Sequence, residues 1–188
     1  MHVYNNNDRT TQLGYGNGWR TNYDQSVLPV TIGGTSYLRY IDDTGTRHYF
    51  VYNPLEGKYI CEYGKDLKIT ENTTYYIMKD TAGNSWEFYK STGKLYRIKD
   101  RIGNLCQVNY SSGRISSITD GAGKSITFAY NASNRLSSIT EPGNRIYSFS
   151  YDGFGSLYKI IYPDLLESTY STNPGTFRLL SATNHDGY

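Results

Sequence analysis

Four acidic residues recur at a regular interval through the middle of the chain, and they are the first candidates for chemistry. Asp80, Asp100, Asp120 and Glu141 follow one another at intervals of 20, 20 and 21 residues. Two carboxylates that face each other can cleave a glycosidic bond, one as the acid and the other as base or nucleophile. Each of these residues, however, stands shortly before a glycine, where aspartate favours a turn by bonding its own backbone. We therefore interpret all four as turn residues, with hydrolysis as the weaker alternative.

The remaining titratable residues form no catalytic or metal-binding pattern. His2, His48 and His185 are scattered, and the sequence contains no GxSxG, HExxH or phosphate-loop motif. Asp42 and Asp43 lack the spacing of an EF-hand loop. We expect His48 to be a structural or surface residue. The sequence thus predicts no catalytic residue, no metal site and no cofactor, and it indicates a protein that is not an enzyme.

Aromatic side chains offer a second kind of chemistry, because the chain holds 21 tyrosines and two tryptophans. Such rings can stack on the apolar face of a sugar while their polar tips form hydrogen bonds. The candidates for ligand stacking are Trp19, Trp86, Tyr96 and Tyr158. A carbohydrate-binding or adhesive module on a bacterial wall protein is therefore the alternative function. For tyrosines that recur in phase with a repeat, core packing is the favoured interpretation.

Charge and hydropathy exclude several classes of protein. The formal net charge is +2, from 19 basic and 17 acidic residues, so the chain lacks the basic footprint of a nucleic-acid binder. No apolar run approaches the roughly 18 residues of a membrane-spanning helix. The N-terminus does not resemble a secretory signal, so a signal would lie outside this chain. Cys61 and Cys106 are 45 residues apart. We favour two buried free thiols, although a disulfide between them stays open.

An internal repeat of about 21 residues sets the positions of the acids and the aromatic residues. Five segments begin at isoleucines separated by 21, 20, 21 and 21 residues, namely Ile77, Ile98, Ile118, Ile139 and Ile160. A first turn carries Gly83, Gly103, Gly123 and Gly143, and a second turn carries Gly93, Gly113, Asn134 and Gly155. A tyrosine column comprises Tyr89, Tyr110, Tyr130, Tyr151 and Tyr170, and an aliphatic column comprises Leu95, Ile115, Leu136 and Leu157.

Two turns and two short β-prone runs in each unit predict one β-hairpin per repeat. Ile126, Phe128 and Tyr130 alternate with small polar residues, which is the period of a strand. The distance from turn glycine to tyrosine varies, which a bulge would absorb. Aliphatic residues three apart, such as Leu136 and Ile139, fit a flat strand poorly. Either both faces are partly covered or the strand ends between them.

The sequence divides into a less regular front and a repeat array. We expect residues 1–75 to form an irregular β cap or plug, and residues 76–188 to form the hairpin repeats. Two diverged hairpins are predicted in the front, one turning at residues 42–45 and another at Gly64. A lone hairpin cannot bury a face, so neighbouring hairpins should join into one twisted, curved antiparallel sheet.

The repeat carries a family resemblance. Residues 151–157, Tyr-Asp-Gly-Phe-Gly-Ser-Leu, resemble the Tyr-Asp-x-x-Gly-x-Leu core of YD repeats, and residues 110–115 and 130–136 resemble diverged copies. Residues 16–23 are similar to a segment that precedes such repeats in bacterial Rhs and wall-associated proteins. The chain thus resembles the YD-repeat, or Rhs-repeat, family, which includes polymorphic toxins and teneurins. Only one unit has a literal Tyr-Asp, and the family's autoproteolytic segment is absent.

The resemblance implies an all-β fragment of a spiralling shell and a non-catalytic, structural role. By analogy, the shell would enclose or display a C-terminal toxin or effector outside the cell, in bacterial competition or contact with other cells. The implied location is secreted or at the bacterial cell surface or wall. The implied partners are further repeats of the same array and an effector after residue 188. A sheet edge around residues 170–188 predicts possible homodimers by strand pairing.

Overall fold

The computed structural model describes residues 2–184, which form eighteen strands and one short 3-10 helix, and no α-helix occurs among them. The strands are β1 (His2–Tyr4), β2 (Trp19–Thr21), β3 (Ser26–Ile32), β4 (Thr35–Ile41), β5 (Arg47–Asn53), β6 (Lys58–Cys61), β7 (Leu67–Glu71), β8 (Tyr75–Asp80), β9 (Ser85–Tyr89), β10 (Leu95–Lys99), β11 (Leu105–Ser111), β12 (Arg114–Asp120), β13 (Ser125–Tyr130), β14 (Leu136–Thr140), β15 (Ile146–Tyr151), β16 (Leu157–Ile161), β17 (Glu167–Thr172) and β18 (Leu179–Thr183). The helix is η1 (Asn6–Asp8).

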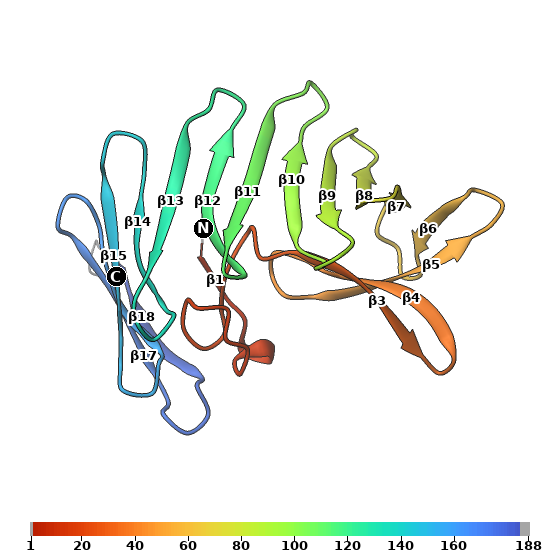
Figure 1. Cartoon of the computed structure of the whole chain (residues 1–188). Coiled ribbons are helices and arrows are strands. Elements are labelled where there is room, and N and C mark those ends of the chain that lie inside the picture. The colour runs from red at the N-terminus through yellow and green to blue at the C-terminus, as the bar shows by residue number, and fades with distance from the viewer. Residues whose placement is uncertain (1, 185–188) are drawn as a thin grey trace. The chain divides into compact units, whose positions relative to one another are not determined.

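Strands β3 to β18 form one antiparallel sheet of 16 strands, in which each strand neighbours the next one along the chain (Figure 1). The sheet is open, with β3 and β18 as its edges, and β1 pairs with β2 separately. This arrangement of consecutive hairpins confirms the predicted all-β repeat fold. It follows from short connections, since a tight turn can only return the chain beside the strand it has just left.

A bulge recurs in the second strand of the hairpins and explains the aliphatic residues three apart. Phe88 faces Leu95, but the next partners are Glu87 and Arg97, so Tyr96 is an extra residue. The same shift occurs in the β13–β14, β15–β16 and β17–β18 pairs. One extra residue returns the side chain three positions later to the same face. Neither of the two alternatives offered by the sequence is needed to explain that spacing.

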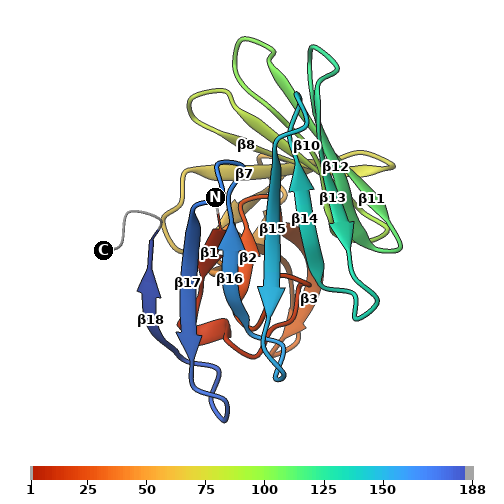
Figure 2. The same cartoon turned by 90° about the vertical axis from the view of Figure 1, so that its left-hand side faces the viewer.

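The chain divides into two compact units. Unit 1 comprises Met1–Thr21, Asn109–Ile118 and Lys124–Tyr188, and unit 2 comprises Asn22–Val108 and Thr119–Gly123. In unit 1, β14 to β18 lie side by side with β1 and β2 behind them (Figure 2). The predicted boundary at residue 75 stays a proposal. Within the front segment, residues 2–21 lie against the repeats, whereas β3 to β7 extend the sheet itself.

In unit 2 the sheet curls around a core of its own. Its buried apolar residues are Val27, Leu38, Tyr40, Phe50, Ile69, Tyr76, Met78, Phe88, Leu95 and Val108. The ring of Tyr40 in β4 lies 5.9 Å from that of Phe88 in β9, and the Val27 amide donates to the Gly93 carbonyl at 2.8 Å. Pro29 lies within β3, which the sequence analysis did not predict. An edge strand tolerates proline because one side of it needs no hydrogen bond.

Candidate functional site

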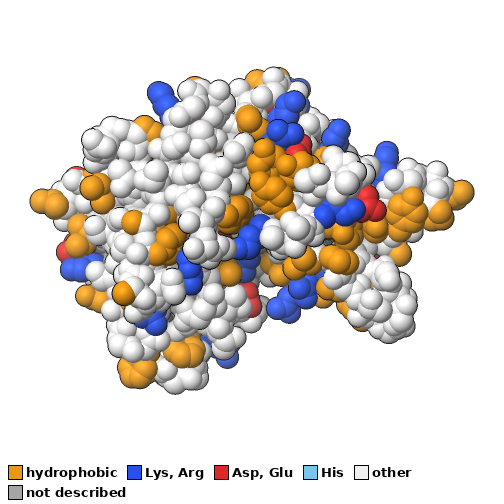
Figure 3. All heavy atoms as spheres, in the orientation of Figure 1, with side chains coloured by type: hydrophobic (Ala, Val, Ile, Leu, Met, Phe, Trp, Pro, Cys, Tyr) orange, Lys and Arg blue, Asp and Glu red, His pale blue; other side chains and the backbone are white. Residues whose placement is uncertain are grey.

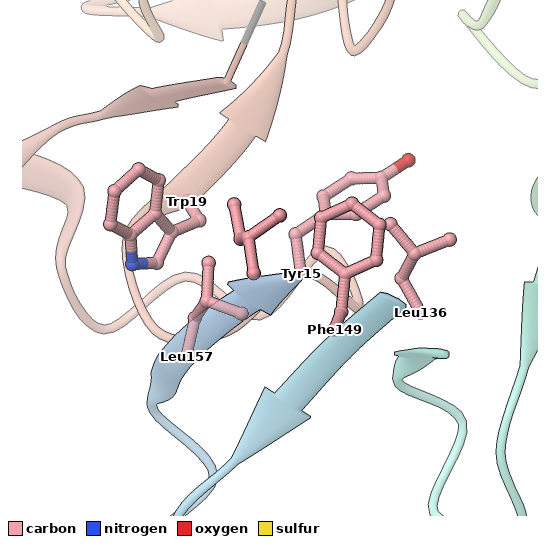
Figure 4. Packing of buried hydrophobic residues seen from close by; sticks show 6 residues of the cluster. Tyr15, Trp19, Leu136, Phe149 and Leu157 are labelled. Atoms are coloured by element: carbon pink, nitrogen blue, oxygen red, sulfur yellow. The ribbon is translucent and has the colours of Figure 1, made fainter. Parts of the chain in front are cut away.

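The most elaborate site of unit 1 is the surface on which the N-terminal segment docks. Residues 14–21 are all buried. Tyr15 and Trp19 pack into one cluster with Leu136, Phe149, Leu157 and Ile160. Figure 4 labels all of these residues except Ile160. Leu136 and Leu157 are fully buried. Two members of the aliphatic column, Leu136 and Leu157, are thus covered by a segment more than 100 residues earlier in the chain.

Close backbone approach holds this segment in place. The Leu136 amide donates to the Gly14 carbonyl at 2.7 Å, which ties the segment to the start of β14. Gly16 has φ +102°, and a Cβ there would lie 2.8 Å from the Leu157 amide nitrogen. A side chain at this position would therefore meet both backbone strain and a clash with backbone. This contact therefore requires glycine at position 16.

Polar contacts complete the docking. The buried Asn17 side chain donates to the Ser156 hydroxyl at 3.3 Å. The Tyr4 hydroxyl donates to the Phe177 carbonyl at 2.7 Å and accepts from the Leu179 amide at 2.9 Å. These bonds join the N-terminal segment to the last hairpin of the described residues. The docked segment therefore bridges β14 through β18.

The phased tyrosines are half-buried instead of fully buried. The guanidinium of Arg114 lies 5.5 Å from the ring centre of Tyr130, and that of Arg135 lies 5.8 Å from the ring centre of Tyr151. Each of these arginines directly precedes an aliphatic core residue and stacks on the tyrosine of the next unit. Burial raises the pKa of Tyr151 well above its usual range.

The other phased tyrosines have different neighbours. Tyr170 packs edge-on against Trp19, with 4.8 Å between ring centres. Tyr89 lies on the face opposite the core, because Phe88 is the residue paired with core residue Leu95. The structure places Tyr110 half-buried at the end of β11. Only some tyrosines of this column therefore pack against the cluster formed with the N-terminal segment, namely Tyr130, Tyr151 and Tyr170.

Turn residues occupy the positions where the repeat requires them. The seven turn glycines have positive φ, and they are Gly83, Gly93, Gly103, Gly113, Gly123, Gly143 and Gly155. The Asp100 carboxylate accepts from the amides of Ile102 and Asn104 at 3.0 and 2.8 Å. Partial desolvation opposes ionisation of Asp100, but hydrogen bonds from the Asn104 side chain and from these amides outweigh it and lower its pKa. The Asp80 pKa is likewise lowered, chiefly by the Asn84 side chain. These carboxylates bind their own turns.

The four aromatic candidates for ligand stacking are divided between the two units. Trp19 is 5 % exposed within the core of unit 1, whereas Tyr158 is 42 % exposed. Trp86 lies in register with Met78 and Ile98 on the core face of unit 2, and Tyr96 lies on the opposite face. Trp19 is thus enclosed in the core of unit 1, and Trp86 and Tyr96 do not share a face of unit 2.

An ionic cluster in unit 2 was not foreseen from the sequence. Asp42 accepts from His48 at 2.8 Å, from Lys65 at 3.2 Å, and from the amides of Thr44 and Thr46 at 3.0 Å. Desolvation alone would raise the pKa of Asp42, but hydrogen bonds from Thr44, His48 and Lys65 lower it far below its usual range. His48 is thus a structural residue. In the sequence, the Asp-Asp-Thr-Gly turn at residues 42–45 is the only indication of this ionic cluster.

Asp42 predicts a pH dependence of stability. Its pKa is lower in the folded than in the unfolded chain, so the carboxylate stabilises the fold above its unfolded pKa of about 4. That contribution begins to decline as the pH falls below about 4 and is fully lost only below the pKa of the folded state. We expect Asp42→Asn to unfold more easily than wild type at pH 7, with the difference shrinking at pH 3, as measured by urea denaturation. An equal difference at both pH values would contradict this role.

Thiols, charge and metal-binding groups add little further chemistry. Cys61 and Cys106 form no disulfide and are half-buried. Burial raises the pKa of the Cys106 thiol, which is hydrogen-bonded to Tyr23. On the face drawn in Figure 3, Lys and Arg side chains are dispersed among uncharged ones. Within residues 2–184, no three His, Cys, Asp or Glu side chains group as metal ligands, and no helix is long and apolar enough to span a membrane.

Comparison with known proteins matches the repeat region. A family model described as Teneurin YD-shell matches residues 89–187, which is 99 of the 188 residues. No curated protein gives a significant match to the chain. The matched segment begins at the end of β9 and includes every strand from β10 to β18.

Proposed function

Because the chain belongs to the teneurin YD-shell family, we propose that it is a non-catalytic wall segment of a repeat shell that encloses or displays a C-terminal effector. The observation that carries this proposal is the open sheet of consecutive hairpins, in which Leu136 and Leu157 are buried under the N-terminal segment. A wall of this kind needs no reactive group. It needs repeated hairpins, a sheet face that is buried from solvent, and edge strands that pair with further repeats.

The proposed setting is outside the cell, in a secreted or surface-attached bacterial protein of the polymorphic-toxin type. Strand β18 has a neighbouring strand on one side only among the described residues, which supports the proposal that more repeats, or a second copy of the chain, pair with β18. Residues 185–188, which complete the edge segment predicted from the sequence, lie outside the described part. The effector would be a polypeptide that follows residue 188 in the intact protein.

The enclosure can be tested in the protein expressed from its complete gene. Wild type would be compared with the double variant Leu136→Asp/Leu157→Asp, which places charges in the buried column, and with Leu180→Asp, whose leucine is 61 % exposed. We expect the segment after residue 188 to resist protease in wild type and Leu180→Asp but to be cleaved in the double variant. Equal cleavage in all three proteins, or no further polypeptide after residue 188, would contradict the proposal.

The absence of catalysis has its own test. Asp100 and Asp120 hold turns through backbone amides, so alanine at both positions should lower the thermal midpoint of unfolding. Any glycoside hydrolysis that a wild-type preparation shows should remain unchanged in the double variant. Loss of such activity in a variant that keeps its circular dichroism spectrum would assign these acids to catalysis.

A further inference from the structure

A row of lysines crosses the face of unit 2 that lies opposite its core. Lys68 of β7 stands directly across from Lys79 of β8, Lys79 across from Ser85 of β9, and Ser85 across from Lys99 of β10. Neighbouring strands are about 4.8 Å apart, so the three ammonium groups share one narrow strip. Like charges directly opposite each other destabilise a sheet, so this row opposes folding.

Only part of this charge is neutralised. Lys68 is paired with Glu56 at 2.7 Å. Lys79 and Lys99 are exposed, and neither forms an ion pair with any side chain of the described residues. An anionic ligand would relieve the repulsion that the protein itself leaves uncompensated.

A cluster of three tyrosines lies further along the same strands. Tyr75 is paired with Tyr89 across β8 and β9. The ring of Tyr96 stacks on that of Tyr75, with 5.1 Å between centres and 8° between planes, and lies 4.9 Å from that of Tyr89. Tyr96 reaches this face because it is the extra residue of the β10 bulge, beside Arg97. The three rings form a compact, half-buried aromatic surface.

A depression of about 370 Å³ is bordered by the lysine row and by Arg97. It is lined by Ile77, Lys79, Ser85, Glu87, Arg97 and Lys99, together with Gly103 and Leu105. Arg97 and Glu87 form an ion pair at 2.9 Å, and the guanidinium of Arg97 lies 5.3 Å from the ring centre of Tyr96. The Nε atom of Arg97 is buried and has no hydrogen-bond partner within the described part of the chain. The floor thus offers fixed donors and acceptors between a cationic strip and an aromatic surface.

We propose that this face of β7–β10 binds an acidic carbohydrate. The tyrosine rings present the flat apolar surface on which a sugar ring stacks, and Lys79 and Lys99 present cations for its carboxylate or sulfate groups. Ser85, Glu87 and Arg97 supply hydrogen bonds to hydroxyl groups. A nucleic acid fits less well, because the whole chain carries a formal net charge of only +2. This binding does not depend on the enclosure of an effector.

The test measures binding of the full chain to a uronic-acid oligosaccharide by isothermal titration calorimetry. A neutral oligosaccharide of equal length and a single-stranded DNA oligonucleotide serve as comparison ligands. We expect saturable binding of the acidic oligosaccharide that weakens with added salt, and no comparable binding of the other two. Absence of saturable binding, equal binding of the neutral oligosaccharide, or tighter binding of the DNA would overturn the proposal.

Three variants identify the site. Tyr96→Ala should weaken binding about three- to tenfold, and Lys79→Gln/Lys99→Gln about tenfold. Tyr158→Ala, which removes the tyrosine of the equivalent bulge in β16, should change it less than about twofold. The lysine variant should also keep or raise the thermal midpoint of unfolding, since it relieves like-charge repulsion. A lower midpoint with unchanged binding would assign the lysines a structural role instead and overturn the site.

Discussion

Replacing Leu157 by alanine is expected to lower the free energy of unfolding by about 2–5 kcal/mol. Leu157 is fully buried between the docked N-terminal segment and the repeats, where it packs with Tyr15, Trp19 and Phe149. Truncation removes apolar contacts and leaves a cavity that two backbone layers tied together by hydrogen bonds cannot easily close. The effect should exceed that of any surface substitution in the same unit.

The measurement is urea unfolding followed by Trp19 fluorescence in a Trp86→Phe background, so that the signal reports on unit 1 alone. Leu180→Ala is the matched control, because Leu180 lies on β18 of the same unit and is 61 % exposed. It should change stability by less than about 0.5 kcal/mol. If Leu157→Ala behaved like Leu180→Ala, the N-terminal segment would not be docked on the repeats in solution.

The second large effect concerns Gly16, where alanine should detach the N-terminal segment from the repeats. The residue has φ +102°, and a Cβ would lie 2.8 Å from the amide nitrogen of Leu157. The left-handed backbone costs alanine roughly 1–2 kcal/mol, and the forced shift against backbone adds about 1–3 kcal/mol. Amide hydrogen exchange of residues 14–21 should accelerate in Gly16→Ala, because those amides become exposed when the segment undocks.

Gly143→Ala separates the two contributions. Gly143 has a similar φ of +94° in the same unit, but no atom lies within 4 Å of the position of its added Cβ. This variant should show only the backbone cost and should leave exchange of residues 14–21 unchanged. Similar exchange in the two variants would mean that strain, and not contact with Leu157, makes glycine necessary at position 16.

The repeat and its hairpins could be predicted from the sequence because the interactions that specify them are local. A turn closes within a few residues, and its aspartate, glycine or asparagine bonds a backbone that is already near. The alternation over residues 126–130 is likewise a property of one strand. The strand order follows from these local features, since consecutive hairpins joined by short turns have little choice of neighbour.

Contacts between distant residues could not be predicted in this way. No local signal shows that Gly16 approaches Leu157, that Phe88 and not Tyr89 faces the core, or that the Tyr96 bulge brings a ring beside Arg97. The Asp42 cluster also depends on Lys65, a residue from a later hairpin. The hairpin unit and its repetition follow from local sequence alone, because a turn is specified by the residues within it. Which face of each hairpin is buried, and what covers it, emerges only in the folded chain, because burial depends on residues that lie far away along the sequence.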